Sequence, residues 1–411
     1  MHVGKPRRAA RRHDKLAIPS PPADLTPVYK KLAGSLGSLP FAGFIFILWA
    51  LAGLASAEAT GISNLTLALI VNDNDPQSVA VAKYYADARQ IPPANVIHTR
   101  FRHEKPRLSA QEFSELEDQV KRQLPAGIQA YALTWTLPYK VECMSISAAF
   151  ALGFDRAYCA KSCKPTRQIP YYNSNSAYPF RDFGIRPTMM LAGENEAQVR
   201  KLIDRGVAAD STRPGGRAYL LSTSSKARNV RSPTFPYIAE RMGSILDVEI
   251  IEADFIDDRD DILFYFTGVT RVQNLASNTF LPGAIGDHLT STGGVLFGTR
   301  QMSALRWLEA GATGSYGTVT EPCSFPSKFP HPAIVIQKYL DGDTLIEAYW
   351  KSVAMPGQGI FIGEPLAAPF KGCSIAMTRA GVFEFENSGG AGQAPELGRR
   401  CRNQVGGSAR P

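Results

Sequence analysis

The sequence lacks any motif that would assign it a chemistry directly. No spacing of Cys, His, Asp or Glu matches a metal site of known type, and the acidic loop at 72–75 lacks the later Glu that a calcium loop needs. The absence of these patterns excludes no enzyme class. It means that function must be inferred from where polar residues fall in the predicted fold.

A basic surface is also missing from the body of the chain. The formal net charge is +8, but residues 1–57 hold eight Lys and Arg against two Asp and Glu. The tail from Asn387 adds four Arg against one Glu, so the segment between carries about −1. A nucleic-acid-binding protein needs a basic patch on its folded part, and therefore no nucleic-acid partner is expected.

An apolar run near the N-terminus predicts export. Residues 39–57 follow two lysines and end in Ala-Ser-Ala, the pattern of a signal peptide that is cleaved before Glu58. We therefore expect a periplasmic or extracellular protein with no further contact with a membrane. The alternative is that the run stays uncleaved and acts as an anchor. Residues 1–38 are predicted to be a disordered basic extension.

Beyond the signal segment, strand and helix patterns alternate. Residues 65–71 form a short apolar run, Ser78 is expected to cap the helix that follows, and residues 95–99 form a second apolar run. Further strands are predicted at 128–135, 188–191 and 260–266, and a helix at 109–124. Asn195 is expected to cap a helix that Gly206 ends, and residues 286–292 are expected to form a short helix or elbow. This rhythm predicts a three-layer α/β sandwich with a mainly parallel sheet, caspase-like or doubly wound, over 58–386. An insertion rich in Cys, Tyr and Asn interrupts it at 143–186, and the tail 387–411 is predicted to be disordered.

We expect disulfides among the six cysteines, because the protein is predicted to be exported and disulfides form outside the cytoplasm. Cys159 and Cys163 are four residues apart in a loop-like stretch, and Cys143 is near them. We predict a local disulfide between Cys159 and Cys163. A zinc site built from the three is less favoured because no His is close, and the remaining cysteines receive no role.

Four acid or amide side chains follow the first predicted strand. Loops at the carboxyl ends of parallel strands are where ligands bind in open α/β sheets, so this loop is a candidate ligand site. The alternative is a turn that caps the next helix, which uses the same residue types. The residues are Asn72, Asp73, Asn74 and Asp75.

The stretch 280–332 holds the largest group of chemically able side chains, set between glycines. We take Asp287, His288 and Glu321 as candidate catalytic residues, and Ser291 and Lys328 as candidate ligand-binding residues. Glu321 has the greatest weight because it follows a small-residue strand at the expected edge of a cleft. Its structural alternative is an ion pair with Lys328 or a helix cap.

Three chemistries remain open for this stretch. Cys323 could be a thiol nucleophile beside His288 or His331. Asp287, His288 and Ser291 are the residue types of an acyl-transfer triad, although adjacent residues point apart on most backbones. A metal could also be held between two or three loops, by His288, His331, Asp287 and Glu321. No cofactor and no metal is assigned.

Two segments of the sequence carry a resemblance to known proteins. One is Asn72-x-Asn74 followed by a helix that ends in Ile91-Pro92, and the other is the string GATGSYGTVTEP at 311–322. Both resemble a family of exported bacterial proteins of unknown function. The likeness covers most of the mature chain and implies export, but it implies no activity.

A more remote likeness is to gingipain-type cysteine peptidases of the caspase-like class. It rests on a strand that ends in a glycine loop and a later helix that leads into a glycine-rich strand. Where that family has Gly-His-Gly, this chain has Phe266-Thr267-Gly268, and no Cys lies between Gly268 and Trp307. The resemblance therefore implies a caspase-like scaffold without its catalytic pair.

Two functional hypotheses follow, and whether the protein is an enzyme stays undecided. The favoured one is a non-catalytic protein that binds a ligand or partner on a caspase-like scaffold. The alternative is an envelope or secreted hydrolase, peptidase-like or metal-assisted, with its site around Asp287, His288 and Glu321. Ligand, partner, cofactor and oligomeric state are left unassigned.

Overall fold

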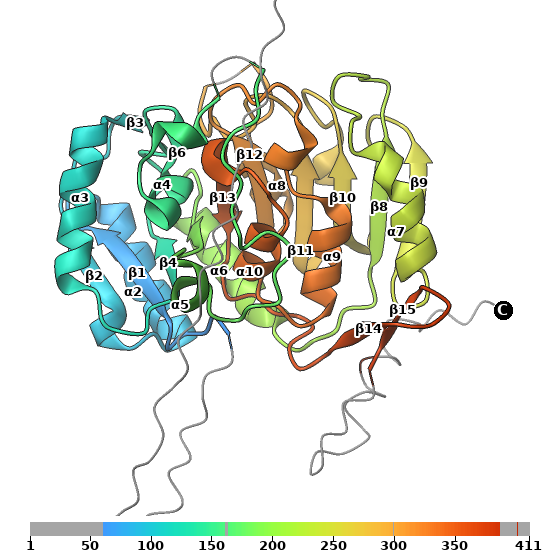
Figure 1. Cartoon of the computed structure of the whole chain (residues 1–411), viewed down its shortest axis with the longest axis horizontal. Helices are drawn as coiled ribbons and strands as arrows, with labels where there is room; N and C mark the ends of the chain where they lie inside the picture. The colour runs from blue at the N-terminus through green and yellow to red at the C-terminus, as the bar shows by residue number, and fades with distance from the viewer. Residues whose placement is uncertain (1–60, 161–162, 299, 387–400, 402–411) are drawn as a thin grey trace, which may run out of the picture. The chain divides into compact units, whose positions relative to one another are not determined.

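The computed structural model describes residues 61–160, 163–298, 300–386 and 401, all within a compact unit that begins at Glu58. Its centre is a sheet of ten strands (Figure 1), in the order β2-β1-β4-β7-β13-β12-β11-β10-β8-β9. In chain order these strands are β1 Leu67–Asn72, β2 Val96–Thr99, β4 Ala130–Leu133, β7 Thr188–Met190, β8 Arg217–Ser222, β9 Asp247–Glu252, β10 Ile262–Thr267, β11 Phe280–His288, β12 Gly314–Thr318 and β13 Gly359–Gly363.

The sheet is mostly parallel. Every neighbouring pair from β2 to β7 and from β12 to β9 is parallel, and β13 is antiparallel to β12. Their side chains are mostly buried, as expected for strands that helices cover on both faces. Two small sheets lie outside it. They are formed by β3 Arg107–Leu108, β5 Lys140–Val141 and β6 Met144–Ser145, and by β14 Ile375–Met377 with β15 Phe383–Phe385.

Helices cover both faces of the sheet (Figure 1). Helix α2 packs against α6, and Arg205 of α6 donates to the carbonyl of Leu308 in α8 at 2.8 Å, which ties these three together. Helix α9 packs against α7 and α10. The helices are α2 Pro76–Arg89, α3 Ala110–Gln123, α4 Ile146–Leu152, α5 Pro179–Phe183, α6 Glu196–Ala209, α7 Phe235–Met242, α8 Leu305–Ala310, α9 Pro332–Leu340 and α10 Leu345–Lys351. The predicted three-layer α/β class is therefore confirmed.

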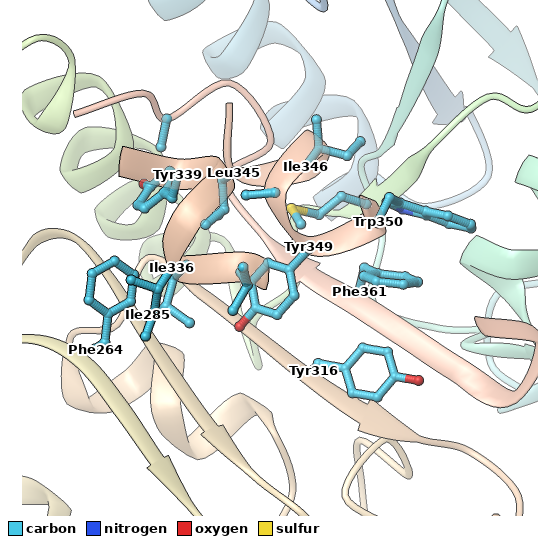
Figure 2. Close-up of a cluster of buried hydrophobic side chains, with 14 of the residues drawn as sticks. Phe264, Ile285, Tyr316, Ile336, Tyr339, Leu345, Ile346, Tyr349, Trp350 and Phe361 are labelled. Atoms are coloured by element: carbon cyan, nitrogen blue, oxygen red, sulfur yellow. The ribbon is translucent and has the colours of Figure 1, made fainter. Parts of the chain in front are cut away.

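Aromatic side chains fill the core between α9, α10 and the centre of the sheet. Trp350 of α10 stacks on Phe361 of β13 with ring centroids 4.4 Å apart, and Tyr316 of β12 meets the same ring edge-on at 5.0 Å (Figure 2). All three are fully buried. Burying rings of this size stabilises the fold by roughly 2–3 kcal/mol each, so this cluster fixes how the two helices sit on the sheet.

The strand order reverses at β1. The chain leaves β1 for β2 on one side, returns to β4 on the other side, and continues outward to β7. The carboxyl ends of β1 and β4 lie side by side, and the connections that leave them lead to strands on opposite sides of this pair. In open α/β sheets, a crevice for ligands forms at such a reversal.

Three local expectations need correction. Ser78 is not the cap of α2: Asp75 caps it, and Ser78 is buried one turn inside, where its Oγ accepts from the Asn72 N–H at 2.9 Å. Gly206 does not end a helix but lies within α6, where a Cβ would fall 2.4 Å from Cγ of Glu364. Residues 286–292 are not a short helix, since β11 continues to His288.

The disulfide prediction was wrong in its pairing. Cys159 and Cys163 are both oxidised, but Cys159 is bonded to Cys143 and Cys163 to Cys323. A third disulfide joins Cys373 to Cys401. The bridge to Cys323 spans 160 residues, so the short spacing that suggested a local pair gave no sign of it. Three disulfides indicate an oxidising environment of the kind that exported proteins meet.

Several other predictions concern parts of the chain outside the described residues. They are the extension 1–38, the signal segment 39–57 with its cleavage site, and the tail 387–411 apart from Cys401. Within the described part of the chain, no helix is both long enough and apolar enough to cross a membrane.

Candidate functional site

Strand β11 places the two central candidates on opposite faces of the sheet. Asp287 is fully buried, and its Oδ1 accepts from Nη1 of Arg231 at 2.5 Å. Arg231 is itself 4% exposed and also donates to the Thr267 carbonyl at 2.7 Å. Burial raises the pKa of the Asp287 carboxyl, although the guanidinium opposes this. Asp287 is therefore the buried partner of a cation and has no path to a substrate.

His288 points to the other face and is held through both ring nitrogens. Trp307 Nε1 donates to Nδ1 at 2.9 Å, and Nε2 lies 3.0 Å from the Met302 carbonyl. The indole can only donate and the carbonyl can only accept, so the ring is neutral with its proton on Nε2. Burial lowers the pKa of His288 to about 4, and the positive charge of Arg231 contributes to the shift. These contacts occupy both of the atoms that a general base or a metal ligand would use.

The His288 environment predicts a loss of stability in acid. The unfolded imidazole has a pKa near its usual value of about 6.5, and the folded one titrates at about 4. Its contribution is therefore present above the unfolded pKa and is lost as pH falls from 6.5 through 4, by about 3 kcal/mol in all. Urea unfolding of wild type and of His288→Gln, at pH 7 and pH 4, measures this. The gap between the two proteins should shrink in acid, and a gap of constant size would contradict the assignment.

The other residues of the central stretch lie apart from this pair. Glu321 is exposed, and its Oε1 accepts from the backbone N–H of Cys323 at 2.8 Å, in a local turn. Cys323 is in a disulfide, which removes its thiol from any nucleophilic role. The Lys328 Nζ is buried between the carbonyls of Lys164 and Pro322, at 2.9 and 3.2 Å. Among the hydrogen bonds and ion pairs of the described residues, none joins Glu321 to Lys328.

Ser291 and His331 complete the set from this stretch. Ser291 is half-buried, and its carbonyl accepts from the Thr318 hydroxyl at 2.9 Å, so it ties the loop after β11 to the end of β12. His331 precedes α9, and burial and the charge of Arg231 both lower its pKa. The structure thus does not assemble the predicted hydrolase residues into one open site.

The acidic loop after β1 forms the turn and cap that were its alternative explanation. The buried Asn72 side chain accepts from the N–H of Phe101 at 3.2 Å and donates to its carbonyl at 3.2 Å. Asp73 lies 2.7 Å from the His98 ring, and Asp75 accepts from the Gln77 N–H at 3.0 Å. Asn74 is exposed and bonds to the same Phe101 carbonyl at 3.3 Å.

This loop nevertheless forms one wall of a crevice at the point where the strand order reverses. The crevice has a volume of about 160 Å³ and gathers residues that follow β1, β2, β4, β7 and β11. Thr136 holds two of these walls together: its hydroxyl donates to the Gly193 carbonyl at 2.8 Å and accepts from the Gly193 N–H at 3.1 Å. The lining residues are Asp75, Gln77, His103, Thr136, Leu137, Gly193, Glu194 and Phe297.

The lining combines polar groups with one aromatic wall. The Phe297 side chain is 37% exposed, whereas most phenylalanines of the described chain are buried. Nδ1 of His103 is buried and has no hydrogen-bond partner among the described residues. Carboxylates come from Asp75 and from Glu194, which also pairs with Arg306. A few converging polar groups beside an aromatic surface are typical of a small-ligand site.

Sequence reasoning missed most of this crevice. It identified Asp75 but not His103, Thr136 or Phe297, and it did not single out Arg231 as the partner of Asp287. The signal available in the sequence was positional, because Thr136 and Gly193 follow two predicted strands as the acidic loop follows the first. Phe297 reaches the crevice from the loop after β11, and no local pattern indicates that.

Comparisons with known proteins add little to this geometry. Neither the protein-family models nor the curated proteins include a match to the sequence. One solved structure, described as "Structure of Protease", is similar at a TM-score of 0.43 and 9% identity, over 77% of this chain and 82% of the other. A similarity of that size carries no argument about chemistry. Among the described residues, no three His, Cys, Asp or Glu side chains gather closely enough to hold a metal ion.

Proposed function

We propose that this protein is a non-catalytic binding protein of an oxidising compartment that takes a small polar ligand in the crevice beside Asp75. The observation that carries the proposal is the crevice itself, at the reversal of strand order between β1 and β4. The contacts of His288, in the site of the alternative hydrolase, support the proposal as well. A hydrolase that uses His288 as its base would need this ring free to move a proton, and both of its nitrogens are engaged.

The ligand is inferred to carry hydrogen-bond donors and a flat or apolar part. Carboxylates and a hydroxyl among the lining groups can accept hydrogen bonds, and the Phe297 ring offers an aromatic surface for stacking. A volume of about 160 Å³ suits a molecule of few non-hydrogen atoms rather than a polymer. A peptide or polysaccharide could enter only with one terminal group.

A fragment screen by ligand-observed NMR tests the proposal. Fragments that bind wild type should compete for one site. Their affinity should fall at least tenfold in Gln77→Trp, which fills the crevice, and in Phe297→Ala, which removes its aromatic wall. Tyr237→Ala is the matched control, because Tyr237 is an aromatic of similar exposure, 45%, on α7. Its binding should equal that of wild type.

The same proteins should be assayed against panels of peptide and ester substrates. The proposal predicts no turnover by any of them. Turnover by wild type that is lost in Glu321→Gln, or fragment binding that ignores both crevice variants, would contradict the proposal and favour the hydrolase.

A further inference from the structure

A second cavity opens at the opposite edge of the sheet, where β1 begins and β13 ends. Its volume is about 260 Å³. Residues 62–64 form one wall, and Arg89 at the end of α2 and Asp210 after α6 form another. The start of α10 closes the cavity with its cap Thr344 and with Glu347 in its first turn. It shares no residue with the crevice beside Asp75 and is independent of the function proposed for that crevice.

One group of charges behind this cavity has a single cation for two carboxylates. The Arg89 side chain is 8% exposed and binds Glu364 through Nε at 2.9 Å and through Nη2 at 2.6 Å. Nη1 of the same guanidinium pairs with Asp210. Tyr85 gives the fully buried Glu364 a further hydrogen bond at 2.6 Å. These contacts stabilise the carboxylates, yet the cluster keeps one negative charge.

The second group centres on Glu347, which is 4% exposed and lines the cavity. Its Oε2 accepts from the N–H and the hydroxyl of Thr344, at 3.1 and 2.5 Å, in the capping box of α10. Its Oε1 has no hydrogen-bond partner among the described residues and faces the backbone of Gly61, where a Cβ would lie 3.3 Å away. This oxygen is not fully buried, so it can accept a hydrogen bond from a ligand in the cavity.

Cations do not balance the buried and half-buried carboxylates around this cavity. The nearby cations are Arg89, Lys338 and Lys351, whereas the carboxylates are Asp210, Asp343, Glu347 and Glu364. Asp341 adds to the carboxylates from the same turn, and Lys371 stands exposed at the rim. Burial and the neighbouring Glu347 raise the pKa of Asp343 to about 7, although Lys351 binds it at 2.7 Å. One further cation would relieve this surplus.

We propose that this cavity binds a small organic cation through a primary ammonium group placed at the Glu347 carboxylate. An ammonium has three donors and one positive charge, which matches the unpartnered Oε1 and the hydroxyls of Ser63 and Thr344 on the same walls. The alkyl part would lie against Ile62 and Leu366. A metal ion fits less well, since no cluster of three ligating side chains occurs in the described part of the chain.

Isothermal titration with n-butylamine at pH 8 tests this inference on the full mature protein. One saturable site is expected, with butyrate and n-butanol as probes that lack the cation and should not bind. Glu347→Gln should weaken butylamine binding at least tenfold. The matched control is Glu112→Gln, because Glu112 fills the same position in the capping box of α3, where it accepts from Ser109 at 2.8 Å, away from this cavity.

A second variant protects the test against misfolding. Ser63 is half-buried and lines the cavity. The variant Ser63→Trp leaves every charge in place and should abolish binding because the indole fills the cavity. Binding that both variants leave unchanged would overturn the inference. So would equal binding of butyrate, equal weakening by Glu112→Gln, or no saturable binding by wild type.

Discussion

Replacing Arg231 by Met should destabilise the protein by about 3–5 kcal/mol, because it leaves the Asp287 carboxylate buried without its cation. Both side chains are nearly inaccessible, at 4% and 0% exposure, and the Arg231 guanidinium also donates to the carbonyls of Thr267 and Pro330. The variant therefore leaves an unpaired charge and removes the side-chain donor of both carbonyls, of which Thr267 keeps the backbone N–H of Leu289 at 3.0 Å. Urea unfolding followed by circular dichroism measures the loss.

Two further variants serve as controls for Arg231→Met. Arg200→Met breaks an exposed i,i+4 pair with Glu196, for which about 0–1 kcal/mol is expected. The double variant Arg231→Met with Asp287→Leu removes both charges and should recover much of the stability. If Arg231→Met were as mild as Arg200→Met, Asp287 would have to be solvated, and its exclusion from catalysis would lose its basis.

Removing the disulfide between Cys163 and Cys323 should cost roughly 3–5 kcal/mol, the largest loss among the three bridges. A crosslink stabilises mainly by restricting the unfolded chain, and the effect grows with the length of the closed loop. This bridge spans 160 residues, whereas Cys143–Cys159 spans 16. The chain-entropy relation gives about 5 kcal/mol for the long loop and about 3 kcal/mol for the short one.

Paired serine variants of each bridge, compared by chemical unfolding, test that order. Non-reducing peptide mapping of wild type should first show the three pairs and no free thiol. A peptide linking Cys159 to Cys163 would restore the pairing predicted from their spacing. Equal losses for the long and short bridges would show that native-state contacts, not loop length, set their contributions.

Local signals in the sequence predicted the elements well. Ser109 and Asn195 marked two helix starts, and each side-chain oxygen accepts from a free backbone N–H there. The apolar run at 260–266 predicted a buried strand because strands covered on both faces are continuously apolar, and β10 is buried throughout. Each of these signals lies within a few residues of the feature that it predicts.

The errors in the prediction have long-range causes. Gly286 suggested a turn, but it lies within β11. A glycine is needed at this position of the strand because a Cβ would lie 2.3 Å from Cε3 of Trp307. Gly206 suggested a helix end, but it lets Glu364 pack against α6. The partners are 21 and 158 residues away in the chain, so single-sequence spacing contains no trace of them. The same holds for Arg231 and Asp287, and for Cys163 and Cys323.

The candidate site was predictable only as a region. Adjacent residues of a strand point to opposite faces, which already argued against Asp287 orienting His288, and the structure places them with Arg231 and Trp307 respectively. The acidic loop was placed at the correct edge of the sheet. Its neighbours in the crevice come from four other loops, and only the strand order brings them together.

The most direct test of this account is the titration of His288 by nitrogen-15 NMR of the histidine rings. Its central claim is that the stretch around β11 is structural, with His288 locked as a neutral ring between Trp307 and Met302. The account predicts the Nε2–H form throughout and no protonation until pH falls to about 4. Protonation near pH 6.5 or above, or exchange of the proton between the two nitrogens, would contradict it and return His288 to the catalytic candidates.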